Sequence, residues 1–293
     1  MTPRDTALAA FVSVVWGLAF VATRFGLEGF TASQLTALRF LIASIPVLFV
    51  ARPAVPWHLL VLIGLTLFAG QFLLLFLAFR HGMPPGLASV TQQTHVFLTV
   101  LLAALLFGER PTARQGLGMV LAAVGLVLVG LTVGADLPAL ALALALSGAL
   151  SWAVGNLLMK HVRGVPMFPL IVWCSLVPPL PMLLLSALWG EASLPTAVAG
   201  ASWVSLGGTL YLGAAATSVY AIWGGLLGRY PAAAVAPLAL LSPVPGVVAS
   251  ALVFGERFTL PRYAGMALIL AGLAVIVLRA PKRTVTVPVP RME

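Results

Sequence analysis

The chain has 293 residues, of which 61% are hydrophobic and only 8% are charged, whereas a soluble globular protein carries about 25% charged residues. It has too few polar side chains to cover a water-facing surface, so we place it in lipid. The net charge of +9 does not indicate nucleic-acid binding, because the 16 Lys and Arg residues occur singly or in pairs between apolar runs, as in membrane-protein loops. The single cysteine excludes a disulfide framework.

Ten apolar segments are long enough to cross a bilayer, which takes about 20 mostly apolar residues each. The sequence therefore predicts an all-α membrane protein with ten transmembrane helices and short Pro-, Gly- and charge-containing connections. The spans lie near residues 7–27, 33–51, 57–79, 85–107, 114–133, 138–160, 167–189, 201–227, 231–254 and 260–279. The first lacks a basic leader and a clear cleavage site, so we expect a retained helix. The tail after Arg279 is expected to be poorly ordered.

The positive charges predict an orientation. With the N-terminus in the cytoplasm, eleven Lys and Arg residues fall on the inner side and four on the outer side, and Arg39 lies within a span. The positive-inside rule then favours a cytoplasmic location for both termini.

One segment occurs twice. Phe107-Gly-Glu-Arg-Pro-Thr returns 147 residues later as Phe254-Gly-Glu-Arg-Phe-Thr, and residues 107–129 match residues 254–276 at ten of 23 positions without gaps. This match predicts two copies of one module.

A weaker correspondence, at an offset of 136 residues, relates Trp16 and Arg24 to Trp152 and Lys160. Five helices per copy is an odd number, so the second copy must enter the membrane from the opposite side. We predict two inverted five-helix repeats, 1–135 and 136–293, that form one integral membrane unit. Inverted repeats of this kind place a substrate site near the midplane, between halves that can rock.

Short motifs are distributed over the whole chain. They are Trp16-Gly-Leu-Ala-Phe-Val-Ala-Thr-Arg, Gly26-Leu, Ala37-Leu-Arg-Phe, Gly86-Leu-Ala-Ser, Gly108-Glu-Arg, Ser151-Trp-Ala-Val-Gly-Asn, Gly228-Arg-Tyr and Val235-Ala-Pro-Leu. Together they resemble the drug/metabolite transporter superfamily, EamA-like branch. The last three are similar to motifs of bacterial exporters of O-acetylserine and cysteine, and related members export aromatic or other neutral amino acids. The resemblance implies a ten-helix exporter of amino acids or similar metabolites in the bacterial inner membrane.

The chain departs from the family pattern in two places. Many members carry Ser-Pro-Val in the fourth helix, where this chain has Thr94-His95-Val96, although the ninth helix keeps Ser242-Pro243-Val244. The small multidrug branch uses a membrane-embedded Glu, whereas all seven acids here lie in loops or at helix ends. Proton coupling would therefore need His95 or an acid at a helix end, and facilitated diffusion is the alternative.

Polar and aromatic side chains inside the spans predict the substrate cavity, because lipid cannot satisfy their hydrogen bonds. Gln92 and Gln93 share a helix face with Ser89 and Val96, and Gln offers a zwitterion both donors and acceptors. The alternative for each residue is polar or aromatic packing between helices. The predicted cavity residues are Gln71, Gln92, Gln93, His95, Trp152, Asn156, Trp16, Tyr220 and Trp223.

Other residues are candidates for gating. Arg39 lies roughly 9 Å from the start of its helix at 1.5 Å per residue, so it could extend outward to the interface or bind a carboxylate or gate the site. Pro243, Pro245 and Gly246 interrupt the ninth helix and could act as a hinge. Glu109-Arg110 and Glu256-Arg257 are expected to be structural charged pairs at helix ends.

We therefore predict a secondary transporter that exports amino acids or related small metabolites by alternating access. The alternatives are a broader drug or nucleotide-sugar carrier, an intramembrane enzyme and a scaffold. An enzyme would need a nucleophile with a base, or clustered His and acids, within a span, and His95 alone is weak support. No cofactor or metal is predicted. The expected partners are a small-molecule substrate and the lipid bilayer, not nucleic acid, and a monomer would suffice, with the oligomeric state left open.

Overall fold

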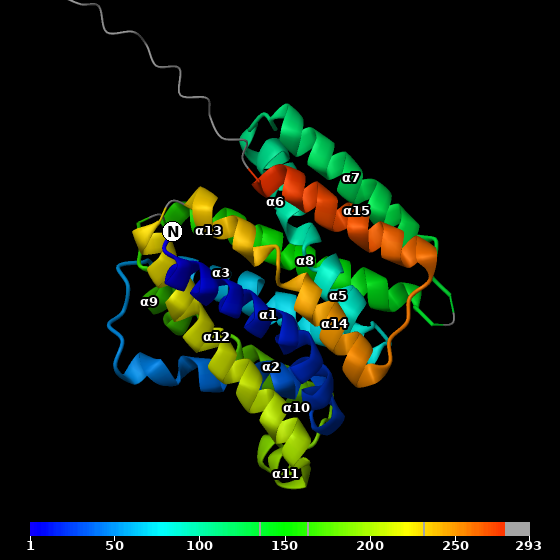
Figure 1. The fold of residues 1–293 in the computed structure, drawn as a ribbon. Coiled ribbons are helices and arrows are strands. Elements are labelled where there is room, and N and C mark those ends of the chain that lie inside the picture. The colour runs from blue at the N-terminus through cyan, green and yellow to red at the C-terminus, as the bar shows by residue number, and fades with distance from the viewer. Residues whose placement is uncertain (135, 163, 231, 279–293) are drawn as a thin grey trace, which may run out of the picture.

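The computed structural model describes residues 1–134, 136–162, 164–230 and 232–278, and this part of the chain is all-helical. The helices form a bundle in which segments far apart in the sequence lie side by side (Figure 1). The predicted tail after Arg279 lies outside the described residues, as do Arg163 and Pro231 in two of the predicted connections.

The helices follow the predicted spans closely. The first half forms α1 Pro3–Gly29, α2 Ala32–Ser44, the 3-10 helix η1 Ile45–Leu48, α3 Trp57–Ile63, the π-helix η2 Gly64–Gly70, α4 Gln71–Arg80, α5 Pro85–Thr91, α6 Thr94–Phe107 and α7 Ala113–Gly130. The second half forms α8 Ala139–Met159, the 3-10 helix η3 Lys160–Val162, α9 Met167–Cys174, α10 Pro179–Leu188, α11 Leu194–Gly200, α12 Trp203–Arg229, α13 Ala232–Ala239, α14 Pro243–Phe254 and α15 Leu260–Val277.

Eight helical segments of the described chain are long and apolar enough to cross a membrane. They are Pro3–Gly29, Trp57–Arg80, Pro85–Phe107, Ala113–Gly130, Ala139–Val162, Met167–Leu188, Trp203–Arg229 and Leu260–Val277. The second and ninth predicted spans contain the shorter apolar helices Ala32–Leu48 and Pro243–Phe254. The short helix α11 was not predicted.

The repeated Phe-Gly-Glu-Arg motif ends one helix and starts the next. Gly108 ends α6 and Gly255 ends α14, both in the left-handed conformation with φ of 63° and 67°, which favours glycine. Four residues later, Thr112 and Thr259 are the N-cap residues of α7 and α15, and Thr112 forms a capping box with Gln115. The motif is therefore a connection between two helices in each half.

The two helices that follow this motif, α7 and α15, lie side by side at one edge of the bundle (Figure 1). Glycines allow their backbones to touch: an added Cβ at Gly118 would lie 2.7 Å from the Gly272 oxygen, and one at Gly125 would lie 2.6 Å from the Gly265 oxygen. The earlier glycine of α7 meets the later glycine of α15, so the two helices run antiparallel.

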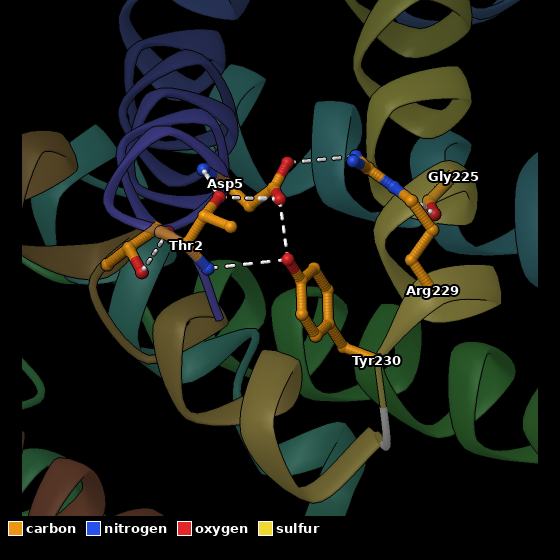
Figure 2. A network of polar contacts seen from close by, with 6 residues as sticks. Thr2, Asp5, Gly225, Arg229 and Tyr230 are labelled. Atoms are coloured by element: carbon orange, nitrogen blue, oxygen red, sulfur yellow. Dashed lines mark hydrogen bonds and ion pairs between the residues drawn. The ribbon is translucent and has the colours of Figure 1, made fainter.

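The bundle has two ends, which we call the N-terminal end and the distal end. The N-terminal end holds the start of α1 and the end of α12, and Figure 2 shows the polar network that joins them. Tyr230 donates to Oδ2 of Asp5 at 2.6 Å, and Arg229 pairs with Oδ1 of the same carboxylate at 3.0 Å. Thr2 also donates to Asp5, at 2.7 Å, so α1 and α12 are fastened together at this end.

The distal end holds the end of α1 and the starts of α2 and α5. The largest buried apolar cluster includes Leu27, Leu35, Phe79 and Leu87, which come from these ends and from the end of α4. Burying such side chains stabilises the fold by about 1.5–3 kcal/mol each, so this cluster holds the distal ends of these helices together.

Candidate functional site

A cavity of about 410 Å³ lies inside the bundle, which falls in the range of about 300–1,000 Å³ typical of small-molecule sites. Its lining comes from both halves of the chain. All nine residues predicted for the cavity line it, namely Gln71, Gln92, Gln93, His95, Trp152, Asn156, Trp16, Tyr220 and Trp223. Arg39 lines it as well.

Gln71 and Gln92 both line the cavity and connect helices. Nε2 of Gln92 donates to the Ala145 oxygen of α8 at 2.9 Å, and Nε2 of Gln71 donates to Oε1 of Gln92 at 3.4 Å. Both glutamines are 2% exposed. The pair therefore joins α4, α5 and α8, and the two roles weighed from the sequence occur together.

Gln93 lies where two interrupted helices meet. Its Nε2 donates at 3.4 Å to the hydroxyl of Ser242, which lies between α13 and α14. Gln93 itself lies in the break between α5 and α6. The fourth span is thus interrupted even though Thr94 and His95 replace the Ser-Pro of the family pattern, and both interruptions face the cavity.

His95 and Trp152 form one aromatic wall. Their rings are parallel within 4° with centroids 4.0 Å apart. Nδ1 of His95 lies 2.7 Å from the Gln92 oxygen, and because a carbonyl only accepts, Nδ1 is the donor. In the neutral ring, Nε2 therefore keeps its lone pair and can accept a hydrogen bond.

Trp16, Tyr220 and Trp223 form a second aromatic wall. The Trp16 ring lies 5.6 Å from the Tyr220 ring and 5.1 Å from the Trp223 ring, measured between centroids. Such contacts hold large side chains in place while leaving apolar surface toward the cavity. Nδ2 of Asn156 donates to the Thr99 hydroxyl at 3.2 Å, which orients its amide.

The residues predicted as a hinge lie at a close contact beside the cavity. An added Cβ at Gly17 of α1 would lie 2.7 Å from Cγ of Pro245, and one at Gly246 would lie 2.8 Å from Cβ of Ser89. Pro243 begins α14 directly after the break. The backbone of α1 thus meets that of α14, and the Ser89 side chain of α5 packs against Gly246 beside the cavity.

Glu256 fastens the distal end. The backbone N–H of Gly86 donates to Oε2 of Glu256 at 3.1 Å. The same N–H also donates to the Ser250 hydroxyl oxygen at 3.1 Å. Burial raises the pKa of Glu256 above 4.5, opposed by hydrogen bonds from Ser250 and Gly86 and by the charge of Arg24. The predicted structural role at a helix end thus extends to α5, α14 and α1.

An ion pair at this end joins α15 to the connection after α7. Arg262 lies 3.0 Å from Asp136 and also donates to Thr132 at 3.0 Å. Hydrogen bonding and the charge of Arg262 lower the pKa of Asp136 from 3.8.

The cavity extends toward the N-terminal end. Its lining includes Met159, Met167 and Val277, which are the last residue of α8, the first of α9 and the last of α15. Nearby, Nζ of Lys160 pairs with Oε1 of Glu109 at 2.5 Å, and both side chains are partly exposed. Part of the cavity wall therefore lies near the N-terminal end of the bundle.

Comparison with known proteins identifies the family. The model of the EamA-like transporter family matches residues 6–131 and 139–278. The chain belongs to the EamA-like transporter family. An intramembrane enzyme is therefore set aside, and the protein is a multi-pass membrane transporter.

Relatives from bacteria support this assignment over nearly the full chain. Proteins of Salmonella typhimurium and Escherichia coli, both named "Probable amino-acid metabolite efflux pump", are 42% and 40% identical, and each match covers 94% of this chain and 95% of the relative. A "Probable terminal-alkyne amino-acid exporter" of Streptantibioticus cattleyicolor is 29% identical over 80% of this chain and 81% of its own. A solved crystal structure with 21% identity has a TM-score of 0.62, covering 94% of this chain and 98% of that one, and supports the fold.

Several lining residues were missed by sequence reasoning, among them Phe20, Phe72, Met159 and Met167. Apolar side chains that face the cavity resemble those that face lipid, so hydropathy gives no signal for them. Ser242 could have been found, since it belongs to the Ser-Pro-Val pattern in the ninth span.

Proposed function

We propose that this chain exports amino acids or related small metabolites across the bacterial inner membrane, as a secondary transporter that works by alternating access. The expected substrates are neutral or aromatic amino acids and solutes similar to cysteine or O-acetylserine. The observation that carries the proposal is the central cavity, lined by polar and aromatic residues of both halves. The 40% and 42% identical relatives named as amino-acid metabolite efflux pumps support it.

The proposed architecture is ten transmembrane helices in two inverted repeats, 1–135 and 136–293. Three observations support it. The family model matches the chain twice, α7 and α15 pack antiparallel through equivalent glycines, and the shorter helices Ala32–Leu48 and Pro243–Phe254 fall where the second and ninth spans are expected. Short spans are accommodated by local thinning of the bilayer and by flanking side chains that extend to the interface.

Pseudo-equivalent charged residues at the two ends support alternating access. The offset of 147 residues relates Glu109 to Glu256, and the offset of 136 relates Lys160 to Arg24. Glu109 pairs with Lys160 at the N-terminal end, while Glu256 feels the charge of Arg24 at the distal end. If both termini lie in the cytoplasm, the distal contacts of Glu256 would close the cavity to the outside, which supports an inward-facing arrangement. Opening the other side would break the Glu256 contacts.

The cavity chemistry suits a zwitterion with an apolar or aromatic side chain. Nε2 of His95 and the amide of Gln93 can accept hydrogen bonds from an ammonium group. The two aromatic walls, one of His95 and Trp152 and one of Trp16, Tyr220 and Trp223, offer apolar contact.

Counterflow of labelled amino acids into proteoliposomes tests the proposal. We expect saturable exchange of at least one neutral amino acid, reduced about 10-fold or more in Trp152→Ala because a cavity wall is lost. Trp203, which is 88% exposed, supplies the matched control, and Trp203→Ala should exchange like the wild type. If folded protein exchanges no member of the panel, the proposal is wrong. Accumulation with and without a pH gradient separates proton coupling from facilitated diffusion.

A further inference from the structure

Arg39 is a buried cation at the cavity wall. It lies in α2, is 8% exposed and lines the cavity, so it does not extend outward to the membrane surface. Its Cζ lies 3.7 Å from the centroid of the Phe72 ring and 5.5 Å from that of Phe40. Phe40 is itself stacked on Phe68, with centroids 4.9 Å apart. A group of packed aromatic rings therefore supports the guanidinium.

The guanidinium has unused hydrogen-bond donors. Among the residues that the structure describes, Nε of Arg39 is the one buried side-chain polar atom without a hydrogen-bond partner. No carboxylate in those residues forms an ion pair with Arg39, and the recorded pairs use Asp5, Glu109 and Asp136 at the ends of the bundle.

Within the described chain, the buried guanidinium lacks an anionic partner that would offset the free-energy cost of its burial. A guanidinium stays protonated in proteins, and a buried charge without a counter-ion is costly. Stacking on aromatic rings offsets part of that cost, but it leaves the in-plane N–H donors unpaired. The site is therefore prepared for an anion that enters through the cavity.

We propose that Arg39 binds the carboxylate of the transported solute, an inference that rests on the proposed function. The fork of guanidinium N–H groups matches the two oxygens of a carboxylate, and such charge-assisted pairs are among the strongest hydrogen bonds in proteins. The solute ammonium is then accepted by Gln93 and by Nε2 of His95, which line the same cavity. Arg39 is thus a specificity-determining residue: solutes without a free carboxylate are rejected.

Wild-type protein gives the first test. Affinities of the purified protein for an amino acid that passes counterflow, and for the carboxamide of the same amino acid, are measured by ligand-induced shifts in thermal unfolding. We expect the carboxamide to bind at least about 10-fold more weakly, since hydrogen bonds to charged groups exceed neutral ones by this order. Chloride, in a separate arm, should not displace the amino acid at equal concentration.

Variants locate the effect. Arg39→Gln should reduce the preference for carboxylate over carboxamide to less than about 3-fold, because an amide donor treats the two groups more equally. Arg39→Lys should keep an intermediate preference, since it retains the charge without the fork. Arg52 is the matched control, an exposed arginine whose Cζ lies 4.1 Å from the Trp57 ring centroid outside the cavity, and Arg52→Gln should keep the wild-type preference.

The outcomes separate the two proposals. Equal affinity for amino acid and carboxamide in wild-type protein, or an unchanged preference in Arg39→Gln, overturns the role of Arg39 while amino-acid exchange still stands. Displacement by chloride at equal concentration overturns it in favour of an inorganic anion. Absence of amino-acid exchange in folded wild-type protein overturns both. If Arg39→Gln does not fold, the wild-type ligand comparison decides.

Discussion

Gln92 and Gln93 are neighbours in the sequence with different surroundings. Gln92 is 2% exposed and donates to the Ala145 oxygen at 2.9 Å, whereas Gln93 is partly exposed to the cavity and donates to Ser242 at 3.4 Å. One side chain therefore contributes mainly to helix packing, and the other remains available to a solute.

Alanine substitutions should separate these roles. Gln92→Ala removes the bond to the Ala145 oxygen and leaves the buried amide of Gln71 without its acceptor, and should destabilise the protein by about 1–3 kcal/mol, seen as a lower unfolding temperature in detergent. Gln93→Ala should leave that temperature nearly unchanged and reduce counterflow. Equal destabilisation by both substitutions would contradict this assignment.

At the same scale, the sequence indicates the polar cavity residues because polar groups within apolar spans need partners. It does not indicate the surroundings of Arg39. The distance of Arg39 from the start of its helix, at 1.5 Å per residue, is compatible with a side chain that extends to the interface and with one that faces the cavity. The packing of Phe72 and Phe40 against the guanidinium decides between the two.

At the scale of elements, the α7–α15 contact depends on glycine. The antiparallel backbones leave no room for a side chain at Gly125, where an added Cβ would lie 2.6 Å from the Gly265 oxygen, whereas an added Cβ at Gly116 of the same helix has nothing within 4 Å.

Substitution at the two glycines should differ accordingly. Gly125→Val should force α7 and α15 apart and cost at least about 1–3 kcal/mol by overpacking. Gly116→Val carries the same change in side chain without the clash. Thermal unfolding of both variants measures the difference, and similar unfolding temperatures would argue against the close contact.

We expect Glu256 to make closure of the distal end sensitive to pH. It faces the Gly86 amide of α5, the Ser250 hydroxyl of α14 and the charge of Arg24 on α1. The closed end raises the pKa of this carboxyl above 4.5, and hydration after opening brings it back. The closed form therefore binds the proton more tightly, so closure weakens as the pH rises through the raised pKa.

Thiol labelling from outside the cell can measure this change. In a Cys174→Ala background, labelling of Ser89→Cys should accelerate with pH, relative to the exposed reference Thr196→Cys, which corrects for thiol ionisation. Adding Glu256→Gln should remove the pH dependence. Glu191→Gln should preserve it, although Glu191 also accepts hydrogen bonds at this end, from Thr31 and Ser33. A pH response that persists in Glu256→Gln would contradict the role of Glu256.

The sequence predicts where helices lie better than where they break. Proline marks the breaks before Pro179 and Pro243. No proline marks the break at Gln92 and Gln93, where backbone bonds such as that from the His95 N–H to the Gln92 oxygen span three residues, and where both side chains bond to other helices or to Ser242. No sequence pattern marks the π-helix Gly64–Gly70 either. The break in the fourth span and this π-helix both depend on contacts with distant helices.

At the scale of the whole molecule, the helix pairing repeats between the halves. α1 packs on α12 and α14, and α8 packs on α4 and α6. In the proposed repeats, α1 and α8 are the first helices, and each packs on the third and fourth helices of the other repeat. The two sets of contacts are therefore equivalent. The sequence match at an offset of 147 residues indicates the two modules. Their arrangement relative to each other is seen only in the contacts between helices, because no local sequence pattern predicts it.

This arrangement predicts opposite exposure of the two repeated motifs. In intact cells with a Cys174→Ala background, a membrane-impermeant thiol reagent should label Arg257→Cys but not Arg110→Cys, and permeabilised cells should show labelling of both. Both positions are exposed, so burial does not confuse the result. Labelling of both from the same face would contradict an inverted repeat.

The charge of the cavity wall sets a limit on what the protein can carry. Arg39 is the permanently charged side chain among the described residues that line the cavity, and it lies in a medium that screens charge weakly. Lipophilic dyes and antiseptics that bear a quaternary nitrogen would be repelled there. Cells that overproduce this transporter should therefore gain no resistance to such compounds, in contrast to cells whose pumps carry a membrane-embedded carboxylate.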